Sequence, residues 1–350
     1  MSHELMFFGG FLIFIALMLA IDLGLFSKGD KPVSLKMASI MSAIWVLFSL
    51  GFYWLLRHYG FELHNIHDLD HLQEIISKHH HDIKIIPGDL AASLDVYNKN
   101  LGLEYLTGYV VEYALSVDNI FVMVLLFTSF GIPERYYHKV LVWGILGAII
   151  MRFLFIFLGA TLIAKFGWIL YVFGAFLVFT GIKMFINRNQ EEEVDPQNHP
   201  VVKFASKYFK VTPKLDAGHF FHLENGVKYM TPLFLVLLVI EFTDLIFAVD
   251  SIPAIFSVTK DPYIVFFSNI FAILGLRSMF FLLVNIIHKF QYLKVGLAFL
   301  LVFIGLKMLL HHWLAEAGFT TTHSLIVIVS ILAISIIASL LFPKKKEIIE

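Results

Sequence analysis

The chain has 350 residues, of which 59% are hydrophobic and 15% are charged, and its formal net charge is −1. Soluble domains are about 45–50% apolar and about 25% charged, so the composition excludes an ordinary soluble domain and predicts a membrane protein. The near-neutral charge argues against a nucleic-acid partner. The absence of cysteine excludes disulfides, thiolate metal sites and cysteine catalysis.

Long apolar runs occupy most of the chain. A membrane-spanning helix needs about 20 mostly apolar residues, and nine runs meet this length: roughly 5–26, 37–56, 104–129, 138–164, 167–187, 230–257, 263–288, 293–312 and 322–342. The runs are continuous rather than alternating, which favours helices over strands. The N-terminal MSHELM lacks the basic region of a signal peptide, so we expect the first run to be a membrane helix. The sequence therefore predicts an all-α, polytopic membrane protein.

The runs and the segments between them divide the chain into six parts. We expect two N-terminal membrane helices (1–57), an extracytoplasmic His-rich segment (58–103), a first three-helix unit (104–187), a cytoplasmic linker (188–229), a second three-helix unit (230–312) and a last membrane helix with a basic tail (313–350). The linker is expected to hold one short helix, around residues 201–209.

Lys and Arg indicate the orientation in the membrane. The connections after the first, third, fifth and seventh runs and the C-terminal tail are rich in these residues, whereas the connections after the fourth, sixth and eighth runs are poor. The positive-inside rule therefore places the N-terminus outside and the C-terminus in the cytoplasm. Nine spans give the same result by parity.

Two apolar stretches carry the same acidic pattern. VEYALSVDNIF (111–121) and VIEFTDLIFAVDSIP (239–253) each hold two acids six residues apart, Glu112 with Asp118 and Asp244 with Asp250. An arginine (Arg152, Arg277) and then a Gly-x-Lys-Met sequence follow in each case: Gly181 to Met184, and Gly305 to Met308. Because each unit holds three spans, the two units must cross the membrane in opposite senses. This is the inverted 3+3 repeat of many secondary transporters, whose sites lie near the bilayer midplane.

Carboxylates at membrane depth are costly and rarely accidental. On an unbroken helix, Glu112 and Asp118 point about 120° apart and lie about 9 Å apart along the axis, so they could share an ion only across a break. Pro253, just past Asp250, removes one backbone hydrogen bond there. Neutral oxygens stand beside the acids, on Ser116, Asn119, Thr243 and Ser251. An all-oxygen set suits manganese, calcium or magnesium, between which these arguments do not choose.

A purely structural role for the buried charges is the alternative. Arg152 and Arg277 could pair with Asp118 and Asp250 and hold the bundle together. However, the five carboxylates of the two stretches, together with Asp22 in the first run, outnumber the two arginines, so another cation or protons must balance the excess. We expect Lys183 and Lys307 to reach towards the membrane interfaces rather than to take part in transport.

The His-rich segment has two interpretations. His64, His67 and His71 would share one face if the segment were helical, which is a plausible spacing for metal capture outside the cell. The alternative is a solvated segment without a ligand role, since no closed ligand set is evident.

Three phrases carry a resemblance to a known family: EYALSVDNIFV (112–122), EFTDLIFAVDSIPAIF (241–256) and TKDPYIVFFSNIFAILGLRSMFF (259–281). Together with AIDLGLF (20–26), they resemble the TerC family of bacterial integral membrane proteins, and its Alx-like branch in particular. The resemblance implies a multi-pass protein of the bacterial inner membrane. It also implies manganese export, or the older label of tellurium resistance. It would place the metal on six residues: Glu112, Asp118, Asn119, Glu241, Asp244 and Asp250.

We therefore expect a secondary transporter that exports a divalent cation, with manganese first and with possible proton coupling. Its partners would be the metal ion substrate and the lipid bilayer, and the sequence identifies no protein partner. Auxiliary roles would fall to Asp22, Ser116, Arg152 and Arg277. The chain has no P-loop and no Gly-rich dinucleotide motif, so neither an enzyme, an ATP-driven pump nor a cofactor is expected. Two alternatives stay open: a non-transporting scaffold or stress-response protein, and a calcium/proton exchanger.

Overall fold

The computed structural model describes residues 3–26, 34–81, 83–188, 195–196, 198–284 and 292–342. Helices dominate this part of the chain, and each predicted apolar run contains one long helix. The long helices are α1 (His3–Phe26), α2 (Leu35–Tyr59), α4 (Leu90–Ser129), α5 (Tyr137–Lys165), α6 (Ile169–Ile186), α8 (Pro232–Phe256), α9 (Pro262–Val284), α10 (Leu293–Leu309) and α12 (Thr321–Leu341).

The shorter elements lie at the ends of the bundle. They are α3 (Leu69–His79), α7 (Pro200–Tyr208), α11 (His311–Glu316), the antiparallel pair β1 (Phe221–Glu224) and β2 (Val227–Met230), and 3₁₀ turns at Gly60–Glu62, Glu134–Tyr136 and Asp216–Gly218. Helix α7 confirms the short helix predicted in the linker. The β-hairpin after it was not predicted.

The protein is a polytopic helical membrane protein. Among the described residues, seven helices are long and apolar enough to cross a membrane, while α1 contributes a shorter apolar stretch, Met6–Ile21, and α10 has 17 residues. The nine predicted runs therefore coincide in position with nine helices. That all nine helices cross the membrane stays a prediction.

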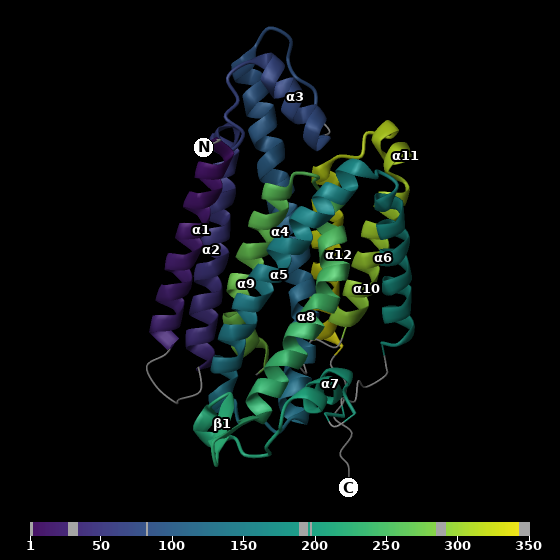
Figure 1. Cartoon of the computed structure of the whole chain (residues 1–350). Helices are drawn as coiled ribbons and strands as arrows, with labels where there is room; N and C mark the ends of the chain where they lie inside the picture. Colours follow the sequence, from purple (N-terminus) through teal and green to yellow (C-terminus); the bar gives the residue numbers. More distant parts are fainter. Residues whose placement is uncertain are drawn as a thin grey trace.

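The long helices run between two ends of the molecule, as Figure 1 shows. One end carries α3 and α11, together with the start of α1, and is called the α3 end below. The other carries α7 and the hairpin β1–β2, together with the last turn of α12, and is called the hairpin end. Helices α4, α5 and α6 alternate in direction, and α8, α9 and α10 alternate in the opposite phase. The two three-helix units thus have the opposite senses that the inverted repeat requires, although their superposition stays a prediction.

Helix α9 forms the centre of the bundle. Almost all of its side chains are buried, and it packs against α2, α4 and α5. Phe266 and Phe267 of α9 contact the rings of Phe8 and Phe11 on α1, with ring centroids between 4.3 and 6.4 Å apart. Such aromatic contacts add to the stabilisation from apolar burial. They fix α1 against the centre of the bundle.

The two acidic helices are continuous. Asp89 caps α4 by accepting a hydrogen bond from the Ala92 amide at 2.9 Å, and α4 then runs unbroken for 40 residues. Its first turns therefore occupy the end of the segment that was expected to be extramembranous, 58–103. Helix α8 is also unbroken, with Pro253 within its last turn. The separation calculated for Glu112 and Asp118 on an unbroken helix therefore applies.

Candidate cation site in the helix bundle

A buried charge cluster lies where four helices meet. The guanidinium of Arg152 on α5 donates one hydrogen bond to the Glu112 carboxylate of α4 and another to the side-chain oxygen of Asn269 on α9. Arg152 Nη2 lies 3.9 Å from Asp244 Oδ1 of α8. Glu112, Arg152 and Asn269 are fully buried, and Asp244 is 6% exposed. Two carboxylates thus share one guanidinium in the interior, which leaves one formal negative charge in excess.

The pairing differs from the structural alternative that the sequence suggested. Arg152 pairs with Glu112 and lies near Asp244, not beside Asp118. Arg277 of α9 contacts His138 of α5, with 3.1 Å between Nη1 and Nε2. A buried arginine network is therefore present, but Arg152 has other partners than those that the structural alternative named.

Asp118 and Asp250 line a cavity at the hairpin end. The cavity has a volume of about 360 Å³ and lies between α4, α6, α8 and α10. Its polar lining residues are Asp118, Asn119, Thr180, Lys183, Asn187, Arg188, Asp250, Ser251 and Lys294. Asn119 and Ser251, the neighbours of the two acids, are buried. The cavity therefore holds two carboxylates and several neutral oxygens from equivalent positions of the two acidic stretches.

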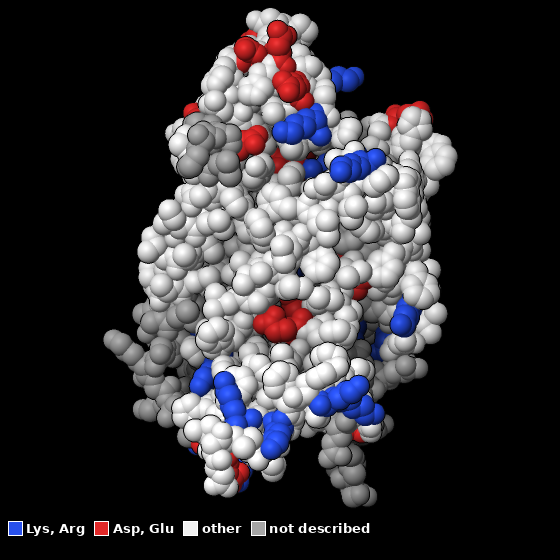
Figure 2. All heavy atoms as spheres, in the orientation of Figure 1, with Lys and Arg blue, Asp and Glu red and all other residues white. Residues whose placement is uncertain are grey.

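Glu241 lies near Asp244 of the buried cluster, and the two acids line one small pocket between α4, α5, α8 and α9. The Glu241 carboxylate packs directly against Gly147 of α5, at a position where a larger residue would collide with it. Figure 2 shows a broad belt without charge between the two ends of the molecule, interrupted by an acidic patch over α8. Glu241 is half-buried on that helix. It therefore approaches the surface that faces lipid in a membrane.

The six predicted ligands do not converge on one point. Among the described residues, no three of their carboxylates come within 4.8 Å of one another. The structure arranges them instead in two groups. Glu112 and Asp244 form the buried pair, with Glu241 near Asp244, and Asp118, Asn119 and Asp250 line the cavity. Of the auxiliary residues, Ser116 is fully buried beside this region. Asp22 lies in α1, but its side chain is outside the described part of the chain.

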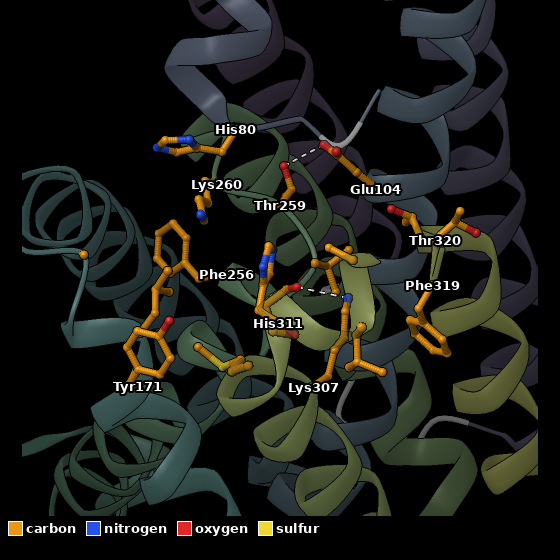
Figure 3. Close-up of a pocket in the computed structure, with 18 residues that line it drawn as sticks. His80, Glu104, Tyr171, Phe256, Thr259, Lys260, Lys307, His311, Phe319 and Thr320 are labelled. Carbon is orange, nitrogen blue, oxygen red and sulfur yellow. Dashed lines mark hydrogen bonds between the residues drawn. The ribbon is translucent and has the colours of Figure 1, made fainter. Parts of the chain in front are cut away.

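A second cavity opens at the α3 end, with a volume of about 410 Å³. Figure 3 shows Glu104, Lys260, Lys307, His80 and His311 around it. The Lys307 ammonium donates to the Ser257 carbonyl oxygen at 3.0 Å, and Thr259 donates to Glu104 at 2.6 Å. Lys307 therefore extends into the cavity, as shown in Figure 3. Lys183 is exposed and lines the cavity at the hairpin end. Each of the two lysines therefore lines a cavity, in addition to any reach towards a membrane interface.

Sequence reasoning missed three residues of this arrangement. Asn269 and Glu104 are isolated polar groups in apolar runs, which was the signal that could have found them. His138 stands at the start of an apolar run and gave no comparable signal. Its contact with Arg277 depends on the packing of α5 against α9.

Comparison with known protein families matches residues 97–347 to the "Integral membrane protein TerC family". The chain belongs to the TerC family. It is also 43% identical over 307 residues to Alx of Escherichia coli, covering 86% of this chain and 85% of that protein. That relative is named "Putative membrane-bound redox modulator Alx".

Two further relatives carry no functional description in their names. An uncharacterized membrane protein of Myxococcus xanthus is 42% identical over 336 residues, which is 95% of this chain and 91% of that protein. Another, from Rickettsia bellii, is 44% identical over 71% of this chain and 79% of its own length. No solved structure matches the chain.

Proposed function

We propose that this TerC protein is a secondary transporter that exports a divalent metal cation, with manganese as the first candidate. The observation that carries the proposal is the cavity at the hairpin end, which Asp118 of α4 and Asp250 of α8 both line. It is supported by the adjacent buried cluster of Glu112, Arg152 and Asp244. Secondary transporters built from inverted repeats place their ion sites at the interface of the two repeats, and this cavity is lined by helices of both three-helix units.

The donor chemistry favours a hard or borderline divalent ion. Asp118, Asp250 and the amide of Asn119 offer oxygen ligands, which suit Mn²⁺, Ca²⁺ and Mg²⁺. The ion would neutralise carboxylates that lipid cannot solvate. Protons would occupy them when the ion leaves, because neighbouring like charges favour protonation of one partner. Cation efflux would therefore be linked to proton entry without a nucleotide.

Arg152 has a structural part in this proposal. It holds Glu112 and Asp244 together across α4, α5 and α8 and keeps half of their combined charge neutralised. The cluster would then act as the barrier between the two cavities rather than as the first binding position. Redox chemistry by thiols of this chain is excluded, because the sequence contains no cysteine.

The decisive experiment measures manganese in cells that express the parent, Asp118→Asn or Asp250→Asn at equal levels. Asn keeps the size of Asp and removes its charge, so both variants should remain folded and lose manganese efflux. Asp95→Asn is the matched control, because Asp95 is an exposed partner of Arg57 on the first turns of α4. Cells with Asp250→Asn that clear manganese as fast as the parent would refute the site.

The same assay separates the alternatives. A calcium/proton exchanger would change the calcium content of the cells and leave manganese unchanged. A scaffold or stress-response protein would leave both ions unchanged for the parent as well as for the variants. Reconstituted vesicles with an imposed pH gradient then test the proton coupling, since manganese movement should follow the gradient.

A further inference from the structure

A second group of possible metal ligands lies at the α3 end, remote from the acidic cavity. His64 precedes α3, His79 is its last residue, and Asp261 lies in the connection between α8 and α9. One ligand atom from each of the three comes within 4.8 Å of the others. The three residues are 3%, 6% and 0% exposed, respectively. The chain therefore brings two imidazoles and one carboxylate together from positions nearly 200 residues apart.

Two of the three ligands are already oriented by hydrogen bonds. His64 Nε2 lies 2.9 Å from Asp261 Oδ2, and its other ring nitrogen, Nδ1, lies 3.0 Å from Glu4 Oε1. The second oxygen of Asp261 accepts from the Tyr263 amide at 2.9 Å. Histidines that bind metals usually direct their second nitrogen to a carboxylate in this way. Glu4 thus orients the His64 ring through Nδ1, as a carboxylate does for a histidine that binds a metal through its other nitrogen.

The third ligand has an unsatisfied nitrogen. His79 Nε2 is buried and has no hydrogen-bond partner among the described residues. The His79 ring lies over the His64 ring, with centroids 5.0 Å apart. An unpaired buried nitrogen is costly. A metal ion between His79, His64 and Asp261 would satisfy it.

We propose that His64, His79 and Asp261 bind a zinc-type divalent cation, which fastens α3 to the connection between α8 and α9. The set of two imidazoles and one carboxylate is one that zinc uses, with water in the fourth position. It differs from the all-oxygen lining at Asp118 and Asp250, so the two places should prefer different metals. The proposal does not depend on transport by the acidic cavity.

The required movement is small. Ligands of a tetrahedral zinc ion stand roughly 3.4 Å apart, as follows from metal–ligand distances of about 2.0–2.2 Å. His64 Nε2 and Asp261 Oδ2, now 2.9 Å apart, would separate slightly. His79 would approach them from within 4.8 Å. Side-chain rotation of His79 on the last turn of α3 achieves this approach without a change of fold.

A proton competes with a metal ion for the ring nitrogen of His64. Burial opposes a charge on His64, but the carboxylates of Asp261 and Glu4 outweigh it and raise the pKa of His64 to about 9. Without metal, His64 is therefore an imidazolium between two carboxylates. That ion pair is the alternative explanation of the cluster, and the experiment must distinguish it from a metal site.

The test uses full-length protein purified in detergent without a polyhistidine tag and treated with a chelator. Zinc is titrated by calorimetry, and bound zinc is counted after desalting. The parent should bind one zinc ion tightly, and Co²⁺ should give the visible absorption of a tetrahedral site. His79→Gln should weaken binding by at least about tenfold, as should Glu4→Gln, which removes only the support of His64.

His67→Gln is the matched control, because His67 belongs to the same segment but is exposed. It should bind zinc like the parent. A parent that binds no zinc would mean that the cluster is only an ion pair and would overturn the proposal. Equal losses in His67→Gln and His79→Gln would also overturn it, because they would indicate loose chelation by surface histidines. If His79→Gln fails to fold, Glu4→Gln decides.

This arrangement also corrects the expectation for the His-rich segment. His64 and His67 both precede α3, so they do not share a helical face with His71. The rings of His67 and His71 lie side by side at a tilt, with centroids 6.1 Å apart, while His64 turns inward to Asp261. The solvated alternative describes His58, His67 and His80, which are exposed, but not His64, His79 and His81, which are buried.

Discussion

At the scale of single residues, the most constrained group is the Arg152 guanidinium. It is fully buried and is held between Glu112, Asn269 and Asp244, on three other helices. Burying such a charge is expensive, and only partners of opposite charge with good geometry compensate for it. Removing one partner therefore lowers the free energy of unfolding by more than the lost interaction itself contributed, because it leaves a buried charge without compensation.

Arg152→Met should destabilise the protein by about 3–5 kcal/mol, because it leaves Glu112 and Asp244 as uncompensated buried carboxylates. The melting midpoint in detergent, followed by size-exclusion chromatography, measures this effect. Adding Glu112→Gln to Arg152→Met should recover part of the loss. Arg188→Met is the control, because Arg188 is exposed at the end of α6 and should cost little. A double variant no more stable than Arg152→Met would contradict this account of the cluster.

The acidic residues themselves were predictable from the sequence, because carboxylates in apolar runs are conspicuous. Their grouping was not. The spacing of Glu112 and Asp118 gives their relative direction on α4, but Asn269 and Asp244 reach the cluster only through the packing of α8 and α9. The partner of Arg152 and the place of His79 likewise depend on contacts between segments far apart in the chain, which no local pattern encodes.

At the scale of elements, α6 and α10 cross with their backbones in close approach. Gly174 of α6 lies against the backbone of Gly305 on α10, and Gly181 lies against the backbone of Ala298. The pairs α4 with α9 and α5 with α8 also pack together. Exchanging the two three-helix units converts the α4–α9 contact into the α5–α8 contact and maps the α6–α10 contact onto itself. The contacts therefore have the pattern that an inverted repeat predicts.

Gly305→Ala should destabilise this crossing. The added Cβ would lie 2.6 Å from the Gly174 carbonyl oxygen, so the two helices would have to separate. Overpacking of this kind costs typically about 1–3 kcal/mol. Gly51→Ala on α2 is the matched control: no atom lies within 4 Å of its added Cβ, and alanine favours a helix interior. Thermal stability in detergent should therefore fall for the first variant and hold or rise for the second. Equal melting midpoints would refute the close crossing.

The long helices were predictable because apolar length alone defines them. The 40-residue extent of α4 was not, because its first turns carry polar residues and their helical state depends on the Asp89 cap and on packing against α2. The hairpin β1–β2 was missed for a related reason. Its strands have four residues each and gave too short a pattern in a charged linker.

At the scale of the whole molecule, two cavities lie at opposite ends of the bundle and the buried Arg152 cluster lies among the helices that connect them. Asp118 and Asp250 line one cavity, and Glu104 and Lys307 line the other. The predicted orientation assigns the acidic cavity to the cytoplasm, from which an exporter collects its ion.

This orientation gives the last prediction. Because the chain has no cysteine, single cysteines can be labelled without a background. Glu74→Cys on α3 and Lys207→Cys on α7 place one exposed thiol at each end of the bundle. A maleimide that does not cross membranes should label Glu74→Cys in intact cells and Lys207→Cys only after permeabilisation. The reverse result would place the acidic cavity outside, and the cation would then have to enter from the side that carries Glu104 and Lys307. Export by the proposed path requires the first result.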